Sequence, residues 1–573
     1  MPLRALVLLL AACAASAFAQ TDRFFQPTES FIRAKDLPED FTAKVRSIQL
    51  IINDVFEGSA AHSEAEADVF KLGNNLHIAS RPSAIRKRLL FQEGDTVSKG
   101  LLLETENSLR SEEFLADAII EVKRWEDGSA HIIVTTYDQW TTTMAFTPSI
   151  VGGNFYYLAG LVESNVLGTG QKLGFFYSHA RERDATLMEY ANRSLTSQRL
   201  RLSSQVGWYS DGYSTEFTLA KDLERRTDRW AFSVSGSSSE MTQYVYFDAN
   251  QLDRLPDSLA RKMQGRPNVI AQFDVVPTHD ASAGITRSFG LNTKFNVSAS
   301  ADWSESYNHG AILQARGINS IVPPHPSALY PEERYDLLGG FTLTVYQYAY
   351  KTVQNYRNLK WNETLQTGWR LSTKSARNME WLGADNHDFY LNHGAVYNNA
   401  WWDALFLVAN ADLHYFVSPG GEFDNGRADL KGEIQWKPHR LTSTSLSASY
   451  GGRFASERSH QYVLGEDTGL NGFPNAYYAG QGLLLLEAEQ RYFPGFEFGT
   501  LVPAFAIYGD AGNAFPSYDD VDMGNLHYSV GVGLRLGFSK TVQKLVYHLN
   551  LSQPIDEPRL KGPVFSFLVK QSL

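Results

Sequence analysis

The chain has 573 residues, a formal net charge of -11 and a mean hydropathy of only -0.29. The acidic balance argues against a nucleic-acid partner, which would need a basic surface. No stretch beyond the first 20 residues approaches the ~20 consecutive apolar residues of a membrane-spanning helix, so such helices are excluded. Aromatic residues nevertheless make up 13% of the chain. This combination is typical of a transmembrane β-barrel, in which lipid-facing and water-facing residues alternate.

The first 19 residues have the pattern of a secretory signal peptide. Arg4 precedes the apolar run 5–13, and small residues precede a cut after Ala19. The alternative is a lipoprotein leader, cut and lipidated at Cys13. If the cut follows Ala19, the mature chain has no cysteine, because Cys13 is the only one. Thiol catalysis would then be excluded.

Residues 20–44 form an N-terminal extension, and residues 45–138 predict one small α+β domain. A strand-like run at 45–58 is followed by two helical patterns and then by a hairpin that turns at Asp127–Gly128. Asp95 or Thr96 is expected to cap the second helix. The residues at helical spacing are Ile85, Leu89 and Leu90 in the first helix and Leu102, Thr105 and Leu109 in the second.

A basic cluster lies in the first of these helices. It consists of Arg81, Arg86, Lys87 and Arg88. Charge runs of this kind usually form the water-facing side of a helix, and a contact with lipid headgroups or a partner is the alternative. We therefore expect all four side chains to be solvated.

Residues 139–573 predict a β-barrel built of successive strands. Near the C-terminus, Tyr528, Val530 and Val532 point one way, whereas Ser529 and Gly531 point the other. Similar segments of about 10 residues recur from Thr141 onward, a length that suits a tilted strand crossing a bilayer. Counting them gives eighteen to twenty segments.

The connections between these segments are unequal in length. Those at 151–153 and 168–170 are tight, whereas 251–268 and 316–335 are long and rich in proline and charged residues. Short turns on the periplasmic side and long loops on the outer side are the expected asymmetry of an outer-membrane barrel.

Several motifs resemble one superfamily. The 45–138 pattern is similar to a POTRA domain, and "AGLVESNVLGTGQKLGFFYS" (159–178) to the second and third barrel strands, with Asn165, Gly168 and Gly170 at the turn. "LGEDTGLNGFP" (464–474) resembles the inward-folding loop, "EAEQRYF" (487–493) the strand after it, and "YGDAGNAF" (508–515) the next one. Together they resemble the POTRA plus outer-membrane β-barrel superfamily of BamA-like and TamA-like assembly factors and two-partner secretion translocators.

The resemblance implies a mainly β fold, with one small α+β POTRA domain followed by a 16-stranded antiparallel transmembrane β-barrel. We follow this number rather than the higher segment count. It also implies a bacterial outer-membrane location with the POTRA domain in the periplasm. A seam between the first strand (141–150) and the last (565–573) would be the weak point of the wall. The implied partners are outer-membrane lipids and a periplasmic or secreted polypeptide, and no cofactor is expected.

The loop departs from the family at one position. The family carries an arginine that pairs with acids on the two following strands, whereas this chain reads Leu470-Asn471-Gly472-Phe473. Asparagine supplies neither the charge nor the bidentate fork. The matching acids here are Glu489 and Asp510. We hypothesise that Arg491 and Arg535, which share the lumen face by strand parity, act as their counter-ions.

No enzyme is indicated. The sequence contains no HExxH, GxSxG, P-loop or paired CxxC motif, so neither a metal site nor a nucleophilic triad is predicted. Glu489 and Asp510 could form an acid and base pair, but a structural ion network is the stronger interpretation in a barrel lumen.

Three functions remain open. The first is an outer-membrane assembly or translocation factor that captures a polypeptide in the periplasm and inserts or passes it at the barrel. The second is a two-partner secretion translocator, although residues 20–44 are too few for the second POTRA domain that this class has. The third is a passive channel or surface protein that kept the fold and lost insertase activity, which the missing loop arginine favours.

Overall fold

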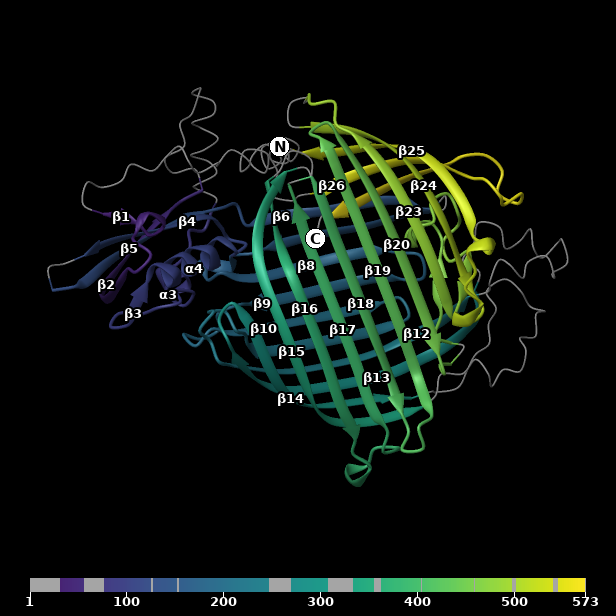
Figure 1. The fold of residues 1–573 in the computed structure, drawn as a ribbon, viewed down its shortest axis with the longest axis horizontal. Coiled ribbons are helices and arrows are strands. Elements are labelled where there is room, and N and C mark those ends of the chain that lie inside the picture. Colours follow the sequence, from purple (N-terminus) through teal and green to yellow (C-terminus); the bar gives the residue numbers. More distant parts are fainter. Residues whose placement is uncertain are drawn as a thin grey trace, which may run out of the picture.

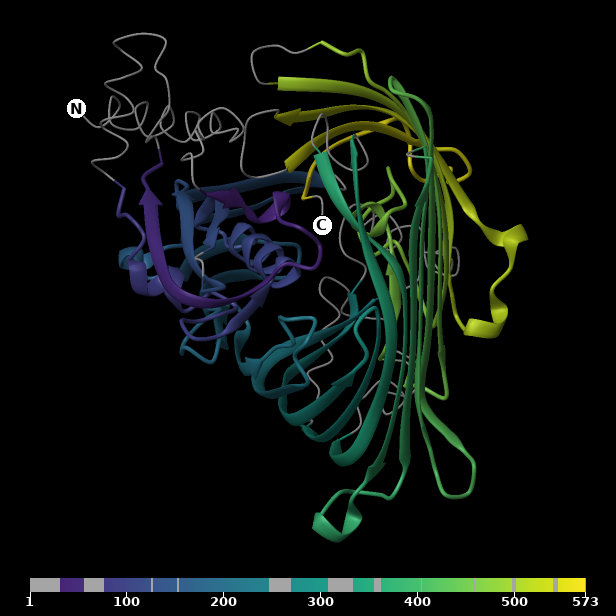
Figure 2. The ribbon, with the colours of Figure 1, turned by 60° about the vertical axis from the view of Figure 1, so that its left-hand side comes forward.

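The structure is a computed structural model, and it describes residues 31–55, 77–124, 127–151, 154–246, 269–307, 333–354, 362–402, 404–457, 459–496, 501–538 and 545–571. The predicted signal peptide and the loop 251–268 lie outside these residues, as does the loop 316–335 except for its last three residues. Figure 1 shows a small N-terminal domain, coloured purple to blue, beside a barrel coloured blue to yellow. In Figure 2, a view turned by 60°, the domain again lies next to the barrel.

The N-terminal domain is a five-stranded sheet with two helices, and its strand order is β1-β4-β5-β2-β3. Strand β5 pairs in parallel with β2 and antiparallel with β4 through the predicted hairpin. The sheet already includes β1, within the segment assigned to an N-terminal extension. Its elements are β1 (Ile32–Arg33), η3 (Ala34–Asp36), β2 (Thr42–Asn53), α3 (Pro82–Arg86), β3 (Thr96–Ser98), α4 (Lys99–Arg110), β4 (Leu115–Arg124) and β5 (Ser129–Asp138).

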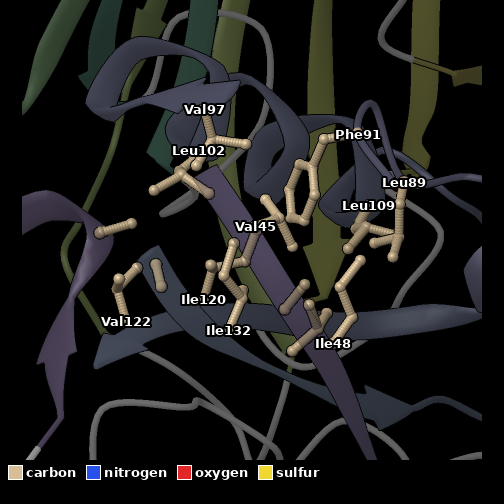
Figure 3. Packing of buried hydrophobic residues seen from close by; sticks show 14 of the residues in the cluster. Val45, Ile48, Leu89, Phe91, Val97, Leu102, Leu109, Ile120, Val122 and Ile132 are labelled. Atoms are coloured by element: carbon tan, nitrogen blue, oxygen red, sulfur yellow. The ribbon is translucent and has the colours of Figure 1, made fainter. Parts of the chain in front are cut away.

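One apolar core holds this domain together, as Figure 3 shows. Leu102 and Leu109 of α4 pack with Ile120 and Ile132 of the sheet, and all four are fully buried. The cap of α4 differs from the prediction. Ser98 is the N-cap, and its hydroxyl accepts a 3.3 Å hydrogen bond from the amide of Leu101. Asp95 and Thr96 do not cap the helix, because β3 occupies residues 96–98.

The barrel has twenty antiparallel strands among the described residues, so the prediction of sixteen strands is wrong. The first ten are β6 (Thr142–Val151), β7 (Asn154–Glu163), β8 (Gln171–His179), β9 (Asp184–Asn192), β10 (Leu200–Tyr209), β11 (Gly212–Lys221), β12 (Trp230–Tyr246), β13 (Val269–Phe289), β14 (Thr293–Ser306) and β15 (Arg334–Gln354). The others are β16 (Asn362–Asn378), β17 (Phe389–Trp401), β18 (Leu405–Val417), β19 (Phe423–His439), β20 (Thr442–Phe454), β23 (Gly482–Tyr492), β24 (Leu501–Phe515), β25 (His527–Phe538), β26 (Leu545–Pro554) and β27 (Val564–Gln571).

The error has a physical origin in the middle of the chain. The motifs that carry the resemblance lie at 159–178 and 464–515, and they say nothing about how many strands lie between them. Strands β9 to β20 fill that interval, and each pairs with its sequence neighbours in the ring, with local register shifts between β12 and β13, β18 and β19, and β19 and β20. The alternation of the residues therefore predicted the strand number better than the resemblance did.

The two faces of the wall differ as the alternation predicts. In β24, Phe505 and Ile507 are exposed outward, whereas Ala504, Ala506 and Asp510 are buried inward. Large apolar side chains are likewise exposed around the ring, for example Trp230, Phe341 and Leu430. Such an outer surface would be unstable in water and suits lipid.

Both ends of the barrel can be assigned from the order of the strands. The connections after β7, β9 and β11 lie at the end that carries the N-terminal domain. Because antiparallel strands alternate in direction, the connections after β12, β14 and β20 lie at the other end. Those three are long, as predicted, but the short connection between β6 and β7, expected on the periplasmic side, lies at this same end. Among the described residues, no helix is both long and apolar enough to cross a membrane.

The ring closes between its first and last strands, as predicted. Strands β27 and β6 are joined through one residue pair in the described part of the chain, Phe567 opposite Ile150. Strand β27 pairs with β26 over the full stretch from Val564 to Gln571. Among the described residues, the seam is therefore the least paired junction of the wall.

The core of the N-terminal domain provides a stability prediction. Ile132→Ala should destabilise this domain by about 2–4 kcal/mol, because it leaves a cavity at a fully buried position. Ile51→Ala is the matched control, because Ile51 lies in the same sheet and is 38% exposed. Urea titration of the full-length protein in detergent, with protease sensitivity of the domain as readout, measures both. Equal midpoints for the two variants would contradict this assignment of the core.

Candidate functional site

The turn motif Asn165, Gly168 and Gly170 lies where the N-terminal domain meets the barrel. It forms the connection from β7 to β8, with η4 (Val166–Gly168) at its centre. The side-chain oxygen of Asn165 accepts a hydrogen bond from the amide of Gly170 (2.7 Å), and its amide nitrogen donates to Ser80 of the N-terminal domain (3.0 Å). The amide of Arg81 donates to the carbonyl of Gly168 at 2.7 Å. The motif is therefore a docking surface for the domain.

Arg88 reaches from the domain into this turn, and its side chain is only 3% exposed. It donates to the carbonyl of Gly170 at 2.7 Å, forms a 2.9 Å ion pair with Glu112, and lies over the ring of Phe114. The expectation that the whole basic cluster is solvated is thus wrong for Arg88. Arg88 lies in the turn after α3, which ends at Arg86, and its guanidinium also donates to the carbonyl of Ala84 at 2.9 Å.

The domain also contacts the two following connections at the same end. Between β9 and β10, Arg193 donates to the carbonyl of Ser111 (3.3 Å). Between β11 and β12, Glu104 of α4 accepts from the amide of Arg226 (2.7 Å). Burial raises the pKa of Glu104. The domain therefore rests on a row of neighbouring turns rather than on a single linker.

Gly170→Ala should loosen this joint. Gly170 has φ +66°, and an added Cβ would lie 2.7 Å from the Arg88 guanidinium and 2.8 Å from the Phe114 ring. We expect a cost of about 2–4 kcal/mol from backbone strain and overpacking together. Gly94→Ala is the control, because Gly94 has φ +93° but nothing within 4 Å of an added Cβ. Hydrogen exchange of 80–90 should accelerate in the first variant only, and equal acceleration in both would argue against the contact.

The segment between β20 and β23 folds into the barrel, and we call residues 461–481 the lumen loop. It contains the short hairpin of β21 (Tyr462–Leu464) and β22 (Tyr478–Gly480), with η8 (Glu466–Thr468) between them. Leu470 and Phe473 are fully buried. The ring of Phe473 packs against Tyr477, Tyr478 and His527 of β25. The apolar part of the loop motif therefore attaches the loop to the inner wall.

Asn471 occupies the position where the resemblance expects an arginine. Its side-chain amide donates to Asp510 Oδ2 at 2.7 Å, and its backbone amide approaches the same oxygen at 3.4 Å. The hydroxyl of Ser529 also donates to this oxygen, at 3.1 Å. A Cβ on Gly472 would lie 3.0 Å from Ser552 of β26, so the loop backbone lies close to the wall here. The loop and Asp510 thus meet through neutral donors.

Glu489, Arg491 and Arg535 form a separate cluster on the same inner wall. Glu489 pairs with Arg491 through one oxygen and with Arg535 through the other, the latter at 2.7 Å. Arg535 is almost fully buried and also donates to Asn550 at 2.6 Å. The structure therefore brings both arginines to Glu489, whereas Asp510 lies with Asn471. The counter-ion role of the two arginines stays a proposal.

The double variant Arg491→Ala with Arg535→Ala tests this role. We expect the barrel to lose heat stability by about 3–5 kcal/mol, because Glu489 would remain buried without a cation. The temperature at which the folded band disappears in a gel mobility assay is the measurement. Arg201→Ala is the control, since Arg201 pairs with Asp222 at 2.8 Å and both side chains are exposed, so no buried acid is left without a cation. An unchanged transition in the double variant would rule out the role.

Local sequence patterns did not predict the residues that the lumen loop contacts outside β23 to β26. These include Arg181, which lies 286 positions from Asp467 of the loop. No local pattern links residues so distant in the sequence. Within the described ranges, no three His, Cys, Asp or Glu side chains gather as metal ligands would.

Comparisons with known proteins give structural neighbours of low sequence identity only. No family model matches the chain. No curated protein matches it either. Among solved structures, it is similar to BamA from Haemophilus ducreyi lacking POTRA domains 1-3, at 14% identity over 92% of this chain and 84% of that one, with a TM-score of 0.42. It is also similar to CdiB from Escherichia coli (11% identity, 98% and 95% covered, TM-score 0.42) and CdiB from Acinetobacter baumannii (11%, 92% and 73%, 0.39). At such scores, function must be argued from this chain itself.

Proposed function

We propose that the chain is a bacterial outer-membrane assembly or translocation factor that receives a polypeptide in the periplasm and delivers it at the barrel seam. The barrel lies in the outer membrane, and the N-terminal domain lies on the periplasmic side. The substrate is an unfolded or extended polypeptide, and outer-membrane lipids surround the barrel. No cofactor or nucleotide takes part.

The seam carries this proposal. In lipid, every unpaired backbone amide or carbonyl costs several kcal/mol, so barrels normally close with a complete ladder. Here β27 and β6 share the single pair Phe567 and Ile150 in the described residues. A junction with so few hydrogen bonds opens at a lower cost than any fully paired one. The edges that it exposes can pair with an incoming strand.

The N-terminal domain offers a second edge for the same kind of pairing. Strand β3 pairs with β2 only at Thr42–Lys44, whereas β2 continues to Asn53. The outer side of β2 from Gln49 onward therefore has no strand neighbour within the described residues. An extended polypeptide can add there by main-chain hydrogen bonds.

A passive barrel is the second candidate, and the neutral contact of Asn471 with Asp510 favours it. If the charged loop anchor of the family is needed for insertion, this chain would keep the fold without the activity. Depletion in cells separates the candidates. A general loss of outer-membrane proteins supports assembly, loss of one secreted protein supports a two-partner translocator, and an unchanged membrane supports a passive barrel.

A disulfide across the seam tests the leading proposal. Ile150→Cys with Phe567→Cys should form a disulfide under oxidising conditions, because the two positions pair directly. We expect the locked protein to lose its ability to restore outer-membrane protein levels in depleted cells, and a reductant to restore it. Cys13 lies in the predicted leader and should not interfere.

Leu534→Cys with Leu549→Cys is the matched control. These residues pair between β25 and β26, inside a continuous ladder. Locking this junction should leave function intact, since it does not need to open. Full activity of the oxidised seam variant would overturn delivery at the seam.

A further inference from the structure

The lumen loop touches walls on opposite sides of the barrel. It leaves from β20 and returns to β23, and Asn471, Gly472 and Phe473 hold it against β24 to β26. Its other contacts reach β12 and the turn between β8 and β9. In the ring order, β12 is separated from β23 by the eight strands β13 to β20, so the loop crosses the lumen.

The first far contact joins Gln461 to the end of β12. The side-chain oxygen of Gln461 accepts from the backbone amide of Tyr246 at 2.9 Å, and its nitrogen donates to the carbonyl of the same residue at 3.1 Å. Gln461 thereby satisfies both backbone groups of Tyr246, as a paired strand would. This fixes the entry of the loop on the far wall.

The second contact is centred on Arg181, in the turn between β8 and β9, which in the ring order lies between the near wall and β12. One terminal nitrogen of its guanidinium donates to Asp467 of the lumen loop at 3.0 Å. The other donates to the hydroxyl of Tyr246 at 3.0 Å, and the guanidinium lies over the Tyr246 ring, 5.0 Å from its centre. Glu182 pairs with Arg181 and accepts from the same hydroxyl. Arg181 thus links three parts of the chain, and its side chain is only 13% exposed.

The ion pair between Arg181 and Asp467 has the reverse arrangement of the one that the resemblance implies. There, the base would lie on the loop and the acids on the barrel. The segment 464–481 carries two acids, Glu466 and Asp467, and no base. At its near wall the loop meets an acid, Asp510, through the neutral Asn471. At the second contact the base, Arg181, lies on the barrel and the acid, Asp467, on the loop. The charged anchor of the loop is therefore a different contact from the one with Asp510, at the turn between β8 and β9.

Of the contacts that hold the lumen loop, the one between Arg181 and Asp467 is the more easily broken. The near wall holds the loop through fully buried apolar side chains and close backbone approach, which water does not replace. The contact with Arg181 consists of polar groups, and the Asp467 side chain is 32% exposed. Burial raises the pKa of Asp467 even though Arg181 acts to lower it, so the arginine only partly offsets the loss of water.

The lumen beside this contact is suited to water. On the inner face of β12 to β14, Ser237 and Ser304 donate to Asp280, and Asp302 pairs with Lys374 of β16 at 2.8 Å. Such a wall conducts ions once no segment crosses it. We propose that Arg181 clasps the lumen loop to the turn between β8 and β9, and that release of this clasp opens an ion-conducting path through the barrel. The proposal rests on the proposed function only in placing the barrel in a membrane.

Conductance of the purified full-length protein in planar lipid bilayers tests the clasp without any substrate. Arg181→Ala should raise the ratio of open to closed states at least about tenfold, the size expected from losing charge-assisted hydrogen bonds. Arg183→Ala is the matched control: this arginine is two residues away, bonds to the carbonyl of Thr242 and to Asp211, and does not take part in the clasp. Its ratio should stay at the wild-type value.

The exchange Arg181→Asp with Asp467→Arg should return the ratio towards wild type, because it restores the pair with reversed sign. If Arg181→Ala does not fold, Asp467→Asn removes the same ion pair from the loop side and should also raise the ratio. A wild-type ratio in these single variants, or an equal rise in Arg183→Ala, overturns the clasp. Because no substrate is present, this outcome is independent of the seam lock, so failure of the clasp and failure of the proposed function are distinguishable.

Discussion

The barrel depends on one constraint: a strand in lipid must find a hydrogen-bonding partner on both sides. This requirement closes the sheet on itself and forces its first and last strands to meet. In this chain nineteen junctions follow the order of the sequence, and only the junction of β27 with β6 joins the two ends. Within the described part of the chain, that junction also has the shortest ladder. The weak point of the wall is thus placed by topology beside the strand that leads directly from the N-terminal domain.

Much of the fold followed from local patterns. The period of two along β25 predicted which face meets lipid, because that alternation is a property of the strand itself. The hairpin at Asp127–Gly128 followed from turn chemistry, with Gly128 at φ +78°. The strand number did not follow from the motifs, since they lie at the two ends of the barrel and the strands β9 to β20 lie between them. The cap of α4 shifted to Ser98 because strand pairing took the earlier residues.

Some contacts of the candidate site could likewise be predicted from local patterns, and others could not. Strand parity placed Glu489, Arg491 and Arg535 on one face, and their contacts lie on neighbouring strands. The motif residues Asn165 and Gly170 could be named from the sequence, but their partners Ser80 and Arg88 belong to another domain. Arg181 and Asp467 meet only because a loop crosses the lumen. Contacts that depend on closure of the ring join residues far apart in the sequence, so no local pattern predicts them.

The strands beside the seam are short, and this has a consequence for the surrounding bilayer. Strand β27 has 8 residues and β6 has 10, whereas β13 and β15 each have 21. At ~3.4 Å per residue and a tilt of about 40°, β27 spans a height of roughly 20 Å, less than the ~25 Å apolar band of a typical outer-membrane barrel. Lipids next to this part of the wall must shorten to cover it, at a cost of fractions of a kcal/mol per ångström of hydrophobic mismatch. Among the described residues, the wall is therefore lowest where it is least paired, and we expect the bilayer to be thinner there than along the taller strands β13 and β15.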